Sequence, residues 1–211
     1  MQEKVALRVL PLDEKCRALN EAYMMPIGYV KNNMFLVDWS ENDFSSLDFY
    51  DLFDIFYRQI YGKEVPYEPS DNLGVGTVYQ IPKEEFEHIM MAYLNIDSET
   101  LQQKTLYHTD TKTYEYRPRG FYEAEYPEHP YPEVVDYTEN ADGTIALLVN
   151  VVFPYEGLSK VCSHEVVVRP LENDGVQYVS NHVIPSEDNI EESWYKPRLT
   201  LAEWAEVYGA E

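Results

Sequence analysis

The chain has 211 residues, of which 45% are apolar, so it can bury a sizeable core in one domain or in two small ones. Its 38 acidic residues outnumber its 16 basic residues and give a formal net charge of −22. The negative electrostatic potential around such a chain repels the phosphates of nucleic acids and of anionic lipids. We therefore expect no nucleic-acid partner. The simplest role of this acidity is to keep the protein in solution.

The first predicted element is a short helix over residues 13–25. Asp13 is a suitable N-cap for it, and Pro26 is expected to stop it because proline disrupts a helix interior. The following stretch from Tyr29 to Trp39 contains an apolar run and is predicted to be a strand or extended chain.

A second helix is predicted to begin at a cap formed by Ser45 or Ser46 and to end at Gly62. The segment from Lys63 to Gly76 is rich in Pro, Gly, Ser and Asp, which is typical of a loop or boundary. We therefore expect residues 1–72 to form a mainly helical N-terminal segment, either separate from the remainder, 73–211, or part of the same domain.

Two further helices and a hairpin are predicted in the middle of the chain. The first helix begins at Pro82 and reaches about Leu94, since proline fits the first turn of a helix. Asp97 or Ser98 is expected to cap a short helix. Tyr107 to Tyr116 is predicted to be a small hairpin.

The strongest structural pattern is an antiparallel meander over residues 133–184. Asp-Gly steps at 142–143 and 174–175 separate β-rich runs, and glycine accepts the positive φ that tight hairpin turns need. The sequence therefore predicts a curved antiparallel sheet in the second half of an α+β protein.

The last predicted helix begins with a capping box at Thr200 and ends at Gly209. Leu201, Trp204 and Tyr208 recur at helical spacing, so we expect this helix to dock on the body of the protein through one apolar face.

No catalytic or metal-binding motif accompanies these elements. The sequence lacks a phosphate-binding glycine loop, a nucleophile elbow and a paired-histidine zinc motif, so we expect no cofactor and no metal. Cys16 and Cys162 could form one disulfide or remain buried thiols, and two cysteines alone favour thiols over a disulfide framework.

Two histidines of the meander are candidate ligand-binding residues. His164 lies on one predicted strand, and His182 lies on the next one, in phase with Tyr178. If residues 173–175 form the turn, both histidines face the same side, whereas a slip of one residue separates them. They form either a polar pair in a sheet-lined pocket or two hydrogen-bonded histidines in a half-buried sheet.

The segment from Tyr114 to Tyr131 concentrates aromatic, proline and arginine residues in a predicted loop. Such a surface can stack a sugar ring or receive a peptide, but it can also be a proline-stiffened connection pinned by its own rings. Its candidate binding residues are Tyr116, Arg117, Arg119, Tyr122 and Tyr126.

Several stretches carry a family resemblance: Pro82 to Glu87, Tyr107 to Arg119, Asp142 to Ile145, His164 to Arg169 and Gln177 to Asn181. They resemble an uncharacterised group of exported proteins, often lipoproteins, from Gram-positive gut bacteria of the clostridial kind. The resemblance implies no catalytic residues. It implies an extracytoplasmic or cell-surface location, with a lipid-anchoring leader that is missing from this sequence; composition alone leaves a cytoplasmic location open.

The order of helices and strands is also similar to that of cystatin-like and NTF2-like folds, which serve enzymes and binding modules alike. The leading hypothesis is a non-enzymatic binding module of the bacterial cell envelope, with a protein or glycan partner and with membrane contact only through a lipid anchor. The alternative is a small-molecule enzyme of NTF2-like type that uses a histidine or carboxylate in a sheet-lined pocket. A third hypothesis is a structural domain of a larger envelope assembly.

Overall fold

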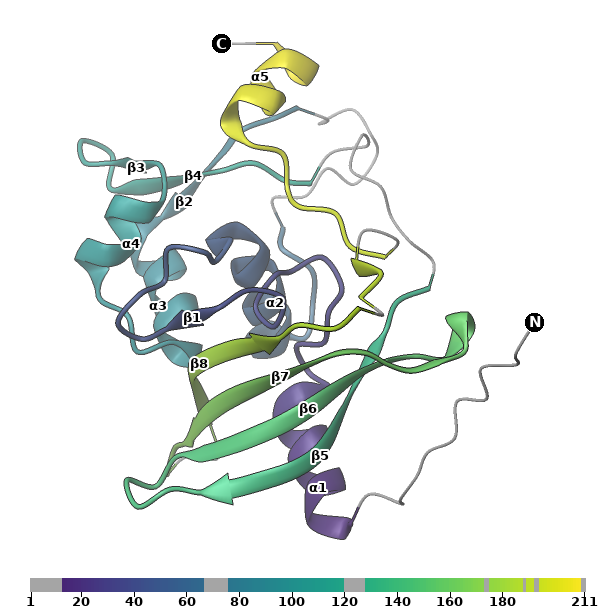
Figure 1. Cartoon of the computed structure of the whole chain (residues 1–211). Helices are drawn as coiled ribbons and strands as arrows, with labels where there is room; N and C mark the ends of the chain where they lie inside the picture. The colour runs from purple at the N-terminus through teal and green to yellow at the C-terminus, as the bar shows by residue number, and fades with distance from the viewer. Residues whose placement is uncertain are drawn as a thin grey trace. The chain divides into compact units, whose positions relative to one another are not determined.

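The computed structural model describes residues 13–66, 76–119, 128–172, 175–187, 189–191 and 194–209. Its contacts group the chain into two compact units, and each unit uses two segments of the chain (Figure 1). The first unit comprises Met1–Leu47 and Tyr126–Tyr195, and the second comprises Asp48–Glu125 and Lys196–Glu211. Neither unit therefore begins or ends near residue 72. Helices and antiparallel sheets occur together, which confirms the α+β class.

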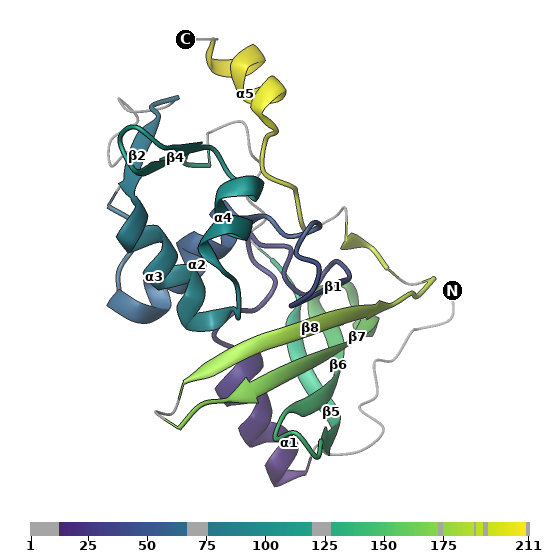
Figure 2. The same cartoon turned by 90° about the vertical axis from the view of Figure 1, so that its left-hand side faces the viewer.

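The first unit contains a five-stranded antiparallel sheet with the strand order β1-β8-β7-β6-β5, which confirms the predicted meander (Figure 2). Its strands are β1 (Trp39–Ser40), β5 (Tyr131–Glu139), β6 (Ile145–Phe153), β7 (Leu158–Pro170) and β8 (Val176–Ile184). A short 3₁₀ turn, η2 (Pro154–Glu156), connects β6 to β7. Strands β5 to β8 follow one another in sequence and pair through short connections, whereas β1 pairs with the distant strand β8.

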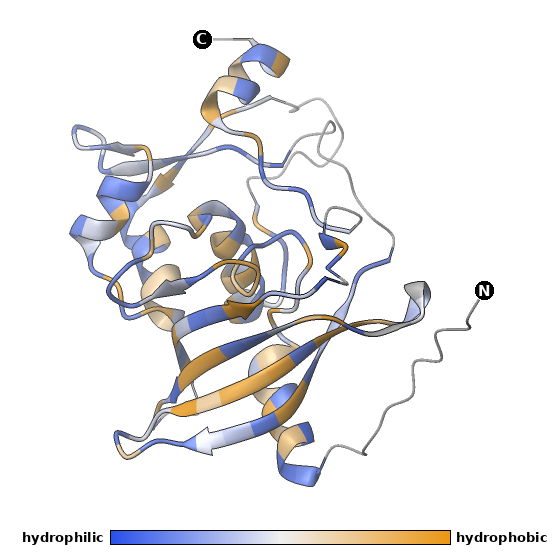
Figure 3. Ribbon diagram, in the orientation of Figure 1, coloured by the Kyte–Doolittle hydropathy of each residue, from blue (hydrophilic) through white to orange (hydrophobic). Residues whose placement is uncertain are grey.

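One face of this sheet is the core of the first unit. Leu147 and Val149 on β6 and Val166 on β7 are fully buried, whereas alternate residues of the same strands are more exposed, as expected for period-two strands. Figure 3 shows β6 as mostly hydrophobic and β5 as more hydrophilic.

Helix α1 (Glu14–Leu19) contacts β5, and the chain continues without a break into the π-helical turn η1 (Asn20–Met24). The carboxylate of Asp13 accepts a hydrogen bond of 2.7 Å from the Cys16 N–H, which confirms the predicted N-cap.

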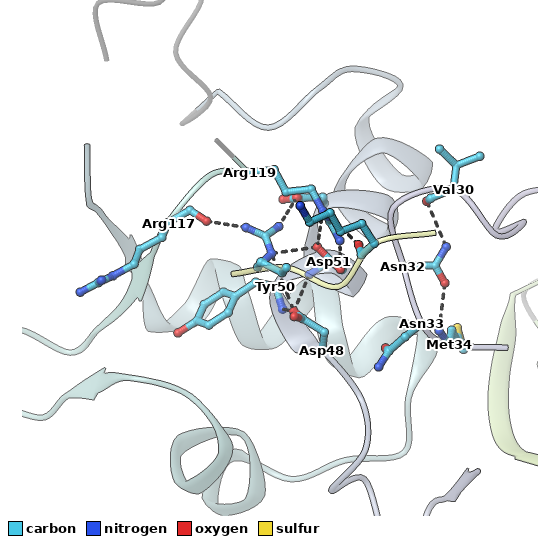
Figure 4. A network of polar contacts seen from close by, with 12 residues as sticks. Val30, Asn32, Asn33, Met34, Asp48, Tyr50, Asp51, Arg117 and Arg119 are labelled. Atoms are coloured by element: carbon cyan, nitrogen blue, oxygen red, sulfur yellow. Dashed lines mark hydrogen bonds and ion pairs between the residues drawn. The ribbon is translucent and has the colours of Figure 1, made fainter. Parts of the chain in front are cut away.

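The predicted extended stretch from Tyr29 to Trp39 is wrong, because a buried asparagine folds it into turns. The Asn32 side chain donates to the Val30 carbonyl and accepts from the Met34 N–H, at 3.2 and 3.0 Å (Figure 4). These side-chain bonds replace the ladder bonds that a strand would make. Only Trp39 of the stretch joins a strand, β1.

The second unit combines helices with a three-stranded antiparallel sheet of order β2-β4-β3. The helices are α2 (Phe49–Tyr61), α3 (Lys83–Tyr93), α4 (Ser98–Lys104) and α5 (Leu201–Tyr208). The strands are β2 (Tyr79–Pro82), β3 (Tyr107–His108) and β4 (Thr113–Tyr116). The predicted hairpin is therefore confirmed, and the four predicted helices form within a few residues of their expected bounds.

The N-cap of helix α2 lies two or three residues after the predicted serine caps. Asp48 is its N-cap, and one carboxylate oxygen accepts from the Tyr50 and Asp51 N–H groups, each at 3.0 Å. The helix ends as predicted at Gly62, which adopts a left-handed φ of 64°.

Aromatic rings form the core of the second unit. Phe86 of α3 stacks on Phe53 of α2, with ring centroids 5.0 Å apart, and on Tyr114 of β4, at 4.4 Å. All three side chains are fully buried. Each such ring pair contributes about 0.5–1.5 kcal/mol beyond the area that it buries, so this stack holds α2, α3 and β4 together.

Candidate functional site

A buried histidine cluster lies on the core face of the five-stranded sheet. His164 of β7 has no exposed surface, and its Nε2 and Nδ1 atoms lie 2.8 Å from the Tyr29 hydroxyl and 2.7 Å from the Asn181 Oδ1. The ring of Phe35 stacks on the imidazole at 5.2 Å between centroids. Tyr178 packs edge-on against Phe35, so aromatic side chains surround the imidazole.

The hydrogen bonds of this cluster determine the tautomer of His164. The Asn181 Nδ2 donates to the Val37 carbonyl at 2.8 Å, so its Oδ1 must be the atom that faces the imidazole. The His164 Nδ1 therefore carries the proton, and its Nε2 accepts from the Tyr29 hydroxyl.

Burial lowers the pKa of His164 to about 4, although the hydrogen bond to Asn181 opposes the shift. The ring is thus neutral at pH 7, with both nitrogens in use. Burial also raises the pKa of Tyr29 well above its usual value, so the hydroxyl keeps its proton.

His182 does not join this cluster. In the ladder, Glu165 is opposite His182 and Val183 is opposite His164, so the two histidines lie on opposite faces of the sheet. The His182 side chain is 71% exposed, and its Nδ1 lies 3.3 Å from a carboxylate oxygen of Asp38. The histidine pair that an in-phase register would form is therefore absent from the sheet.

A bulge in β8 places His164 and His182 on opposite faces of the sheet. Val167 pairs with Ser180 and Val168 pairs with Tyr178, which leaves Val179 as an extra residue. Tyr178 consequently faces the core while His182 faces away from it, and the expected phase between these two residues is wrong.

A buried aspartate–arginine cluster occupies the second unit. The fully buried carboxylate of Asp51, on α2, accepts from Arg119 at 3.0 and 2.6 Å and from the Arg198 Nε at 2.8 Å (Figure 4). The Arg119 and Arg198 side chains are only 9% and 6% exposed. Arg198 also donates to the Arg117 carbonyl. One carboxylate therefore binds two guanidinium groups from distant parts of the chain.

Two further aspartates of α2 complete this cluster. Asp54 accepts from the Arg198 Nη2 at 2.8 Å and from the Tyr116 hydroxyl at 2.6 Å. The Asp48 carboxylate lies 3.9 Å from the Arg198 Nε. Burial and the charge of Asp51 raise the pKa of Asp48. Burial alone would lower the pKa of Arg198, but the carboxylates of Asp51, Asp54 and Asp48 raise it well above its usual value.

A third polar group, Glu87, connects α3, α4 and β4. The residue is buried, and its carboxylate accepts from Lys83 at 2.5 Å, Ser98 at 2.6 Å and the Tyr114 hydroxyl at 2.7 Å. Burial alone would raise the pKa of Glu87, but these hydrogen bonds outweigh it and lower the pKa. The group is a structural crosslink with its acceptor capacity in use.

The described part of the Tyr114 to Tyr131 segment is held by the protein itself. Tyr116 is fully buried, Arg117 donates to Glu115 at 2.9 and 2.6 Å, and Arg119 binds Asp51. The segment's other two candidate residues, Tyr122 and Tyr126, lie outside the described residues.

Sequence reasoning missed the aspartate–arginine cluster. Asp48, Asp51 and Asp54 recur every third residue, a spacing that places them along one side of a helix, and this was the available signal. Arg198 stands 147 residues from Asp51 in the sequence, so no local pattern connects the two.

The described residues contain no group of three or more His, Cys, Asp or Glu side chains that could hold a metal ion. Cys16 and Cys162 are both buried free thiols, as predicted. Burial raises the pKa of Cys162 to about 11, so this thiol is not an activated nucleophile. Across the described ranges, no helix is both long and apolar enough to span a membrane.

Fold and site together define an α+β protein in which the buried side chains of His164, Asp51 and Glu87 each belong to an internal hydrogen-bond network. The chain matches the model of a family of unknown function, DUF6070, over residues 1–198, and it belongs to that family. No curated protein and no solved structure matches it. The expectation of an uncharacterised family is thereby confirmed.

Proposed function

We propose that this protein is a non-enzymatic interaction module. The observation that carries the proposal is the state of His164, the candidate for proton transfer. Both of its ring nitrogens are engaged, by Tyr29 and Asn181, and Phe35 covers its face. A general base needs a free nitrogen within hydrogen-bond reach of its substrate.

The alternative, an enzyme of NTF2-like type, draws less support from the described residues. Its candidate carboxylates are also engaged: Asp51 binds two arginines, and Glu87 accepts from three side chains. A catalytic role for any of these groups requires the loss of at least one internal hydrogen bond before substrate can bind.

The proposed contact surface remains the segment from Tyr114 to Tyr131. Its first part is fixed to α2 through Tyr116 and Arg119, which anchors the segment at one end. Tyr131, at its other end, is 38% exposed. The partner is a protein or a cell-wall glycan, since tyrosine rings suit both kinds of ligand.

The proposed location is the outer face of a bacterial cell membrane, with attachment through a lipid-anchored leader. This part of the proposal rests on the resemblance to exported Gram-positive proteins. The net charge of −22 agrees with it, because such a chain would contact an anionic membrane only through an anchor.

The test is capture of a partner by the purified full chain. Wild type, Tyr122→Ala/Tyr126→Ala and the control Tyr155→Ala are immobilised and exposed to a solubilised envelope fraction and to peptidoglycan fragments. Tyr155 is 70% exposed and lies outside the segment, so it serves as the tyrosine control.

We expect saturable binding by wild type and by the control, and none by the double variant at an unchanged melting temperature. Equal binding by all three proteins would refute the segment as the contact surface. Turnover of a small molecule that His164→Gln abolishes, with the fold retained, would refute the non-enzymatic assignment.

A further inference from the structure

Strand β5 forms one edge of the five-stranded sheet and is nine residues long (Figure 2). Among the strands of the described residues, it pairs with β6 alone. A free edge of this length can present a row of N–H and C=O groups to a strand of another molecule, and such pairing leads to aggregation. The state of the N–H groups along this edge therefore decides whether the sheet can be extended.

Two side-chain oxygens accept hydrogen bonds from N–H groups of β5. The Oδ1 of Asn20, in η1, accepts from the Val134 N–H at 3.2 Å. The Oδ1 of Asp136 accepts from the N–H of the next residue, Tyr137, at 2.8 Å. Neither acceptor belongs to β6, so both N–H groups bond outside the β5–β6 ladder. An added strand would need these same two donors.

A proline removes a third donor from this edge. Successive N–H groups of a strand alternate between its two sides, so position 132 faces the same side as Val134. This position is Pro132, which has no N–H group. The ladder then shifts between Val134 and Asp136, which leaves Val135 as an extra residue. Because of this bulge, the next N–H on the free side is that of Tyr137.

The opposite edge of the sheet is closed by similar means in the described part of the chain. The two-residue strand β1 covers part of β8, and beside it the Asp38 Oδ1 accepts from the Val183 N–H at 2.7 Å. The chain then turns back on β1, since Ser40 and Asp43 exchange two backbone hydrogen bonds, of 3.0 and 2.9 Å. Side-chain carboxylate or amide oxygens thus replace a neighbouring strand on both edges.

We propose that Asn20 and Asp136 are edge guards, whose side-chain oxygens prevent β5 from adding a strand of another molecule. A strand added here would have to break both existing bonds before it formed its own, so it would gain no net hydrogen bond at Val134 or Tyr137. Without the two oxygens both N–H groups become free donors, and pairing gains both bonds. The sheet then becomes a surface for self-association.

The test removes the two acceptors and controls for charge. The guard-free variant is Asn20→Ala/Asp136→Ala. The matched control is Asn20→Asp/Asp136→Asn, which keeps an acceptor oxygen at both positions and leaves the net charge at −22, because it gains one carboxylate and loses another. A second control, Glu165→Ala, removes an exposed carboxylate from β7 and leaves the β5 edge unchanged.

Light scattering over a range of protein concentrations measures the mass of each protein at high salt, which screens the repulsion between acidic chains. We expect the mass of the guard-free variant to rise above that of wild type as the concentration increases. Both controls should match wild type. A folded guard-free variant with the mass of wild type would overturn the proposal. Equal association of either control would also overturn it, because charge and not the acceptor would then be the cause.

Amide hydrogen exchange on the unmodified chain provides a second test that needs no variant to fold. We expect the Val134 and Tyr137 amides to exchange many-fold more slowly than amides of an unstructured peptide, since both are hydrogen-bonded. Exchange of these two amides at the rate of an unstructured peptide would overturn the proposal, because Asn20 and Asp136 would then not hold the donors of this edge.

Discussion

Acidification should destabilise the first unit through one residue, His164. Its pKa in the folded protein is about 4, against an ordinary value of 6.5. Between these two pH values the unfolded chain binds a proton that the folded protein does not. The stability contributed by the neutral ring is therefore fully present above pH 6.5 and is lost as the pH falls towards 4.

The size of this destabilisation follows from the pKa shift of His164. At about 1.4 kcal/mol for each pH unit, a shift from 6.5 to about 4 corresponds to a loss of about 3 kcal/mol in the free energy of unfolding. Other groups also titrate in this range, so the quantity to measure is the difference between wild type and His164→Gln. Glutamine can retain hydrogen bonds but does not titrate.

The assay is urea unfolding at several pH values from 7 to 4. The free energy of unfolding of wild type minus that of His164→Gln should fall by about 3 kcal/mol over this range. His182→Gln is the matched control, because it removes an exposed imidazole and leaves His164 in place. A difference between wild type and His164→Gln that does not change with pH would refute the reasoning.

Three further predictions concern the second unit and the thiols. Arg198→Ala should lower the free energy of unfolding by about 3–5 kcal/mol in urea titrations, because it leaves buried carboxylates uncompensated; a loss below 1 kcal/mol would show that water compensates them. Gly76→Ala should cost about 1–3 kcal/mol, since the new Cβ meets Tyr208 and the φ of 81° is unfavourable, and an unchanged melting temperature would contradict this packing. Cys16 and Cys162 should react with a thiol reagent only after unfolding without reductant; absence of labelling in mass spectra would indicate a disulfide.

Features that depend on neighbouring residues were predictable from the sequence. The capping box at Thr200 and the cap at Asp97 each use a side chain and an N–H group three residues apart, so the sequence contains the whole interaction. The meander was predictable for the same reason: alternating apolar residues and Asp-Gly turns specify strands locally.

Features that depend on distant contacts were not predictable. Asn32 folds its own segment into turns, but only because the structure buries its amide where a surface asparagine would remain in water. The bulge at Val179 changes which residues of β8 face the core, and no turn residue marks it in the sequence. The aspartate–arginine cluster combines side chains from α2, Arg119 and Arg198, so it exists only in the folded protein.

The central claim is that the protein binds a partner through the Tyr114 to Tyr131 segment and not through chemistry at His164. The most direct test measures capture of the proposed envelope partner by His164→Gln and by Tyr122→Ala/Tyr126→Ala, side by side and below both melting temperatures. We predict that His164→Gln retains wild-type binding and that the tyrosine variant loses it. Loss of binding by a folded His164→Gln, with binding retained by the tyrosine variant, would contradict the claim and place the functional site at the histidine.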